Sequence, residues 1–154
     1  GWRDGIPGRS FLAGLSSRHA RTTDVHVSEK TAPAEFSLIA KLAALADVVI
    51  VNGFIRVSAF KGSIDLSESQ INLLKQFSAL DKPFVFVLYG SPYVIAFVPE
   101  LPSYVLTYEY YPGAEEAALK CVLGEIAFKG KLPVELPGLD KVGDSVTRSR
   151  EAAR

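Results

Sequence analysis

The sequence has few of the residues that build disulfides, metal centres or nucleic-acid surfaces. Its 154 residues include one cysteine, Cys121, and two isolated histidines, so an internal disulfide is excluded and none of the usual zinc-ligand spacings occurs. Lysine and arginine (17) balance aspartate and glutamate (17), which leaves no basic field to attract nucleic acid. We therefore expect no metal site and no nucleic-acid partner.

Methionine and long unbroken apolar runs are also missing. A chain without methionine is expected to be a processed form or a cut piece of a longer protein. The most apolar stretch, residues 84–106, is divided by Gly90, Pro92, Pro99 and Pro102 into pieces too short to span a bilayer. The sequence predicts no membrane partner. Residues 1–4 do not have the pattern of a signal peptide, and one could have been removed by cutting, so the compartment is left open.

The patterns of nucleotide-binding and receiver-like sites are absent as well. No predicted strand is followed by a glycine-rich dinucleotide fingerprint or a lysine-bearing P-loop. The aspartates at positions 24, 47 and 65 are scattered over a predicted strand, a helix end and a loop. His26 shares a strand face with Asp24 and Ser28, but no positioned nucleophile accompanies it. The sequence thus predicts no cofactor.

The chain does contain 48% hydrophobic residues, arranged in alternating helical and strand patterns. Such alternation favours an α/β fold, which we expect to be a three-layer αβα sandwich with an open, mostly parallel sheet of about five or six strands. Residues 1–140 are predicted to form this single domain, and residues 141–154 a frayed C-terminal tail. The predicted strands are residues 23–28, 48–51, 84–89, 105–108 and the edge strand 131–136, and the predicted helices are residues 11–17, 34–46, 68–80 and 112–127.

Local signals mark where two of these helices begin. Ser10 stands where an N-cap oxygen would hold the free amides of the first helix. Ser67 and Gln70 have the spacing of a capping box ahead of the third. In the last helix, Glu116 and Lys120 are placed for a favourable i,i+4 ion pair.

Ligands of open α/β sheets bind beyond the carboxyl ends of the strands, so the informative residues are those that follow each apolar run. Desolvation by the neighbouring aromatics and Pro112 would raise the pKa of Glu109 toward the range of a general acid, and a solvated loop carboxylate is the alternative.

Phe60, in a loop with no helical or strand period, is either an interface contact or a scattered surface residue. No catalytic residue is predicted. The predicted substrate-cleft or interdomain residues are Asn52, Phe60, Tyr89, Ser91, Glu109 and Tyr110.

Several passages resemble the second domain of family 3 glycoside hydrolases. Residues 82–93 join a proline-led buried strand to a Gly-Ser-Pro turn, as in that family. Residues 111–118 resemble its aromatic-Pro-Gly turn and alanine-rich helix, and residues 123–125 and 130–134 its Leu-Gly end and closing Gly-Lys-Leu-Pro strand. Residues 34–51 are similar to the family's helix and Ala-Asp-Val-Val-Val passage.

This resemblance covers most of residues 34–138 and implies an αβα sandwich that packs against an N-terminal TIM barrel. The barrel would hold the sugar-binding pocket and the aspartate nucleophile, so carbohydrate would bind through that partner and the isolated chain would be inactive. Residues 55–63 depart from the β-glucosidase branch, whose corresponding loop is rich in glutamate, glycine and aspartate-arginine. The departure favours the β-N-acetylglucosaminidase branch, in which the barrel supplies a histidine-aspartate pair as acid/base.

The alternative is a stand-alone flavodoxin-like module that uses the strand-end cleft to bind a small ligand or to signal. The length of the parent reading frame discriminates the two. A barrel of about 250 residues upstream would support the enzyme, whereas a complete gene of this size would support the module.

Overall fold

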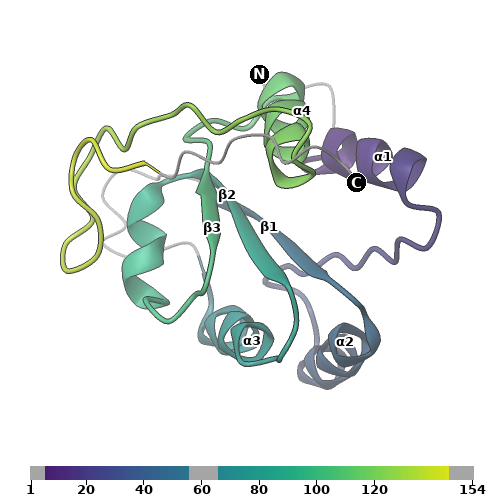
Figure 1. Ribbon diagram of the computed structural model, residues 1–154. Helices are drawn as coiled ribbons and strands as arrows, with labels where there is room; N and C mark the ends of the chain where they lie inside the picture. The colour runs from purple at the N-terminus through teal and green to yellow at the C-terminus, as the bar shows by residue number, and fades with distance from the viewer. Residues whose placement is uncertain (1–5, 56–65, 146–154) are drawn as a thin grey trace. The chain divides into compact units, whose positions relative to one another are not determined.

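The computed structural model describes residues 6–55 and 66–145 (Figure 1). The chain divides into two compact units. One unit is the continuous segment Thr23–Tyr108, which contains the sheet. The other combines Gly1–Thr22 with Glu109–Arg154 and contains two helices from opposite ends of the sequence. We call them the sheet unit and the helical unit.

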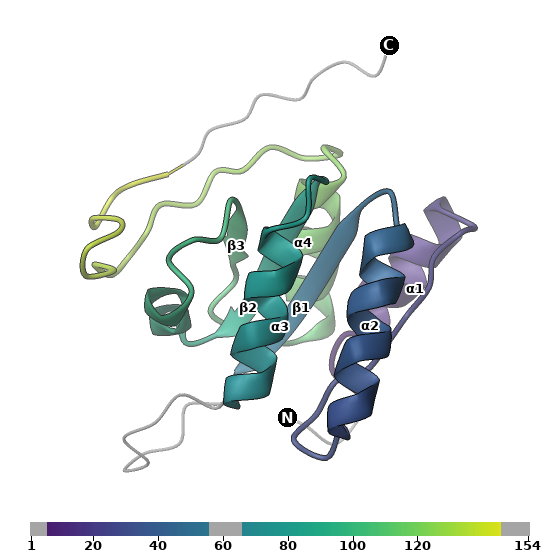
Figure 2. The same cartoon turned by 90° about the horizontal axis from the view of Figure 1, so that it is seen from below.

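The sheet unit has the α/β architecture predicted from the sequence. Its elements are α2 (Pro33–Leu45), β1 (Val49–Ile55), α3 (Glu68–Ser78), β2 (Phe84–Gly90), the 3₁₀ helix η1 (Pro92–Phe97) and β3 (Tyr104–Leu106). The sheet has the order β1-β2-β3 with every pair parallel, and α2 and α3 cover the same face (Figures 1 and 2). The parallel pairing requires crossover connections, and α3 supplies the one between β1 and β2.

The described residues contain three strands, so the predicted five or six is wrong. Residues 23–28 alternate polar and apolar but form no ladder, and Val25 is 42% exposed. Residues 131–136 bond within their own loop instead: the N–H of Leu132 donates to Asp144 O and that of Leu136 to Asp140 O, each at 2.8 Å. Polar–apolar alternation and flanking prolines are typical of strands, but a strand also needs a neighbouring strand to pair with its backbone N–H and C=O groups. The local sequence pattern does not provide that neighbour.

Helices α2 and α3 confirm the sequence reading of this region. The capping box of α3 is present, with Gln70 N donating to Ser67 Oγ at 3.3 Å and Ser67 N donating to Gln70 Oε1 at 2.9 Å. In α2, Ile39 and Ala43 are buried. At the C-terminus of that helix, the Lys82 ammonium donates to the carbonyls of Ala44 and Ala46, the latter at 2.6 Å.

The Lys82 ammonium satisfies unpaired carbonyls at the C-terminus of α2 and complements the dipole of that helix. Lys82→Met is therefore expected to lower the free energy of unfolding by about 1 kcal/mol. Urea denaturation of the variant and of Lys41→Met measures this, since Lys41 is exposed on the same helix. Equal midpoints for the two variants would show that the capping contact contributes nothing.

The helical unit is built from α1 (Arg9–Arg18) and α4 (Pro112–Val122), which pack against each other. The predicted Ser10 cap is wrong: Gly8 occupies the N-cap with φ 87°, and no side chain near it in sequence caps the helix. Helix α4 ends five residues earlier than predicted. Gly124, at φ 72°, turns the chain so that the N–H of Glu125 donates back to Lys120 O at 2.8 Å, which closes the helix.

Candidate functional site

The carboxyl ends of β1 and β2 meet at a point of very close backbone approach. Their register runs to the last residue of each strand, placing Ile55 opposite Gly90. Gly90 has φ 105°, and a Cβ on it would lie 2.0 Å from the carbonyl oxygen of Ile55. Only glycine fits this position, where the chain leaves the sheet through Ser91 and enters η1.

Beside this junction lies a group of side chains that we call the strand-end cluster: Asn52, Phe54 and Tyr89. Phe54 and Tyr89 are opposite each other in the register, and their rings stack with centroids 4.5 Å apart and planes 8° from parallel. The Tyr89 hydroxyl donates to Asn52 Oδ1 at 3.3 Å. Asn52 and Phe54 share a sheet face because they are two residues apart on one strand.

The structure therefore brings together Asn52 and Tyr89 from the predicted site. Tyr89 is completely buried, so its ring supports the strand ends from inside, while Asn52 is half-buried. Ser91 is half-buried at the start of η1. Glu109, which is exposed, and Tyr110, which is half-buried, belong to the helical unit. Phe60 lies outside the described residues.

Sequence reasoning missed the unusual backbone of Tyr108, which follows β3. Its φ of 63° is the only left-handed value among non-glycine residues in the described ranges. A bulky residue is rarely found in this region, and such outliers gather at sites where surrounding structure holds them. Burial raises the pKa of the Tyr108 phenol. The residue is uncharged at neutral pH and marks the point where the chain leaves the sheet unit.

A second residue that sequence reasoning missed is Glu115, in the first turn of α4. It is only 5% exposed, and its carboxylate accepts three backbone N–H groups from the start of α1. The sequence does contain a sign of this burial, because Glu115 lies on the same helix face as Ala118 and Leu119, which are both buried. A carboxylate on an apolar face requires partners, but the partners lie too far away in sequence for local patterns to reveal them.

The strand-end cluster brings together a phenol, a carboxamide and an aromatic ring, groups suited to packing and hydrogen bonding. Across residues 6–55 and 66–145, no three histidine, cysteine or acidic side chains are grouped closely enough to hold a metal ion. None of the helices in those ranges combines the length and apolarity needed to cross a membrane.

The chain is similar to known proteins over most of its length. A sequence model described as the bacterial glycosyl hydrolase family 3 C-terminal domain matches residues 21–127. Among solved structures, one similar chain is a fungal multi-domain GH3 β-N-acetylglucosaminidase described as containing a unique GCN5-related glucosamine N-acetyltransferase region. The identity is 29% and the TM-score 0.73, over 90% of this chain and 15% of that enzyme. No curated protein sequence matches the chain significantly.

Proposed function

The chain belongs to the family of bacterial glycosyl hydrolase family 3 C-terminal domains, and from this membership we propose that it supports a preceding TIM barrel that hydrolyses β-glycosides with retention. The match over residues 21–127 is the observation that carries this proposal. Retention requires a nucleophile and an acid/base on opposite sides of the scissile bond. In the proposed enzyme the barrel provides the nucleophile, and residues 1–140 act as its second domain.

The similarity to a fungal β-N-acetylglucosaminidase favours β-linked N-acetylglucosamine as the sugar. The composition of residues 55–63 agrees with it, because these positions have none of the acidic residues of the β-glucosidase loop. Both catalytic groups then come from the barrel, including the histidine-aspartate pair of that branch. In this proposal the present chain supports the barrel and holds it in position, and it provides no catalytic group.

We assign the interdomain role in the sheet unit to the strand-end residues. Ser91 is half-buried just beyond the carboxyl end of β2, where ligands of α/β sheets bind. Asn52 is half-buried in the middle of β1. The buried Tyr89 contacts Asn52 through its hydroxyl bond. Phe60, Glu109 and Tyr110 stay predicted members of the interdomain surface.

The purified chain is expected to show no hydrolysis of aryl N-acetyl-β-glucosaminides, because a domain without the nucleophile cannot form the glycosyl-enzyme intermediate. A continuous release assay measures this, with the full-length parent enzyme as the positive control. Turnover that co-purifies with the chain through two unrelated columns would contradict the proposal.

A melting-temperature screen of the same chain distinguishes the proposal from a ligand-binding module. A ligand that binds only the folded state must stabilise it by mass action. We expect ATP, flavin mononucleotide and zinc to leave the melting temperature unchanged. A saturable increase with any of them would favour the flavodoxin-like module.

A further inference from the structure

The N-terminus of α1 is capped by a residue about a hundred positions away in sequence. The carboxylate of Glu115 accepts N–H groups from Gly8 at 2.9 Å through Oε1, and from Ser10 at 2.9 Å and Phe11 at 3.0 Å through Oε2. These are amides that a helix leaves unpaired at its start, where the helix dipole also favours negative charge. Helix α1 has no acidic residue in its first turn and no side-chain cap of its own.

Helix α1 also depends on α4 for its packing. With 10 residues it is shorter than helices that are stable alone in water, so its helical state requires tertiary contact. Phe11 is 1% exposed. Gly14 allows the two helices to approach closely, because a Cβ there would lie 2.5 Å from Leu119 Cδ2.

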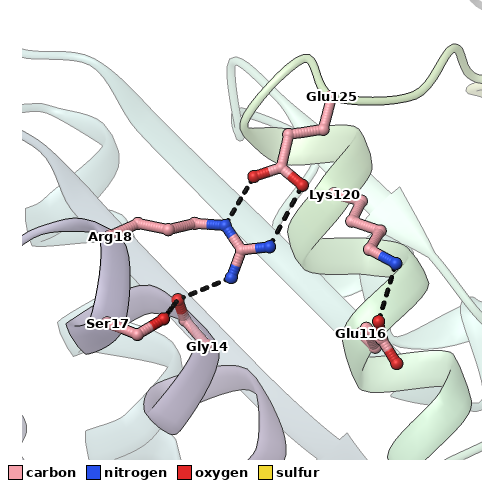
Figure 3. Close-up of polar contacts among 6 residues, drawn as sticks. All are labelled: Gly14, Ser17, Arg18, Glu116, Lys120 and Glu125. Carbon is pink, nitrogen blue, oxygen red and sulfur yellow. Dashed lines mark hydrogen bonds and ion pairs between the residues drawn. The ribbon is translucent and has the colours of Figure 1, made fainter.

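The other end of α1 is fastened to the segment that follows α4 (Figure 3). The Arg18 guanidinium forms a two-pronged contact with Glu125, from Nε at 2.5 Å and from Nη2 at 3.1 Å. Its third nitrogen, Nη1, donates to the carbonyl of Gly14 at 2.9 Å. Arg18 and Glu125 are about one-third exposed, so their contact orients the end of α1 more than it stabilises the folded chain.

We propose that α1 is an anchoring strap, a helix that folds by docking on α4 and is held there by Glu115, and that it ties the polypeptide ahead of it to this domain. The part concerning the polypeptide ahead rests on the proposed function, in which that polypeptide is the catalytic barrel. The anchor itself involves only this chain. A strap of this kind makes Glu115 a determinant of interdomain geometry although it carries no catalytic role.

Amide hydrogen exchange of the full chain tests the anchor without any activity measurement. In Glu115→Gln the charge is lost and one oxygen becomes a donor, so the amides of Gly8, Ser10 and Phe11 are expected to exchange at least about tenfold faster. The amides of Val87 and Leu88, in the central strand, should keep their wild-type rates. The matched control is Glu116→Gln, because Glu116 is the next residue, is exposed, and pairs with Lys120 at 2.6 Å (Figure 3).

Gly14→Ala provides a second route to the same effect, since it crowds Leu119 while leaving Glu115 in place. Selective loss of protection in α1 in both variants, and not in Glu116→Gln, is the expected result. The proposal is overturned by unchanged exchange at Gly8, Ser10 and Phe11 in Glu115→Gln. It is also overturned if that variant does not fold or accelerates exchange equally in β2, because docking of α1 would then be inseparable from global folding.

Discussion

Gly90→Ala is expected to lower the free energy of unfolding by about 3 kcal/mol or more, enough to unfold a marginally stable domain. The added Cβ would lie 2.0 Å from the Ile55 carbonyl oxygen, a backbone atom that cannot move without breaking the end of the β1–β2 ladder. The φ of 105° adds a strain that an alanine cannot relieve. Guanidinium denaturation monitored by circular dichroism measures the loss.

Gly130→Ala is the matched control. A Cβ on Gly130 would meet no atom within 4 Å, so this variant should stay within about 0.5 kcal/mol of the wild type. Equal stability of the two alanine variants would show that the strand ends do not approach as closely as described.

Tyr89→Ala is expected to be destabilising by about 3 to 5 kcal/mol, because it empties the volume of a completely buried ring that stacks on Phe54. Tyr89→Phe keeps the ring and removes the hydroxyl together with its bond to Asn52, which should cost about 1 kcal/mol. The pair of variants separates packing from hydrogen bonding at the strand-end cluster.

Tyr93→Ala provides the comparison for ring removal, since Tyr93 is 49% exposed in η1 and should matter little to stability. The same denaturation experiment ranks the three variants. If Tyr89→Ala were no more destabilising than Tyr93→Ala, the assignment of Tyr89 as the inner support of the cluster would be wrong.

Local sequence patterns correctly predicted the helices and strands that are determined by neighbouring residues in the sequence. The apolar run that begins at Val48 and the run 84–89 became the paired parallel strands β1 and β2, and the Ser67–Gln70 capping box began α3 as expected. Asn52 was expected to follow its strand, but β1 continues to Ile55 and Asn52 lies in the middle of it. Asn52 and Tyr89 are joined by a hydrogen bond because β1 and β2 are neighbours in the sheet.

What the sequence could not provide depends on contacts between distant segments. The N-terminal cap of α1 was assigned to Ser10, whereas Glu115 performs that task from the other end of the chain. Residues 23–28 have the side-chain pattern of a strand without a neighbour to pair with. Gly14 showed no local signal at all, because its importance comes from Leu119 across the helix pair.

The most direct test of the supporting role is kcat/KM for an aryl N-acetyl-β-glucosaminide, measured with the full-length parent enzyme and with a truncation that ends before this chain. The truncated enzyme keeps the proposed nucleophile but loses the domain proposed to support the barrel, and small misplacements at an active site cost about a hundredfold in rate. We therefore predict a fall in kcat/KM of at least about tenfold in a truncated barrel that remains folded by circular dichroism. Full activity of that folded truncation would contradict the account.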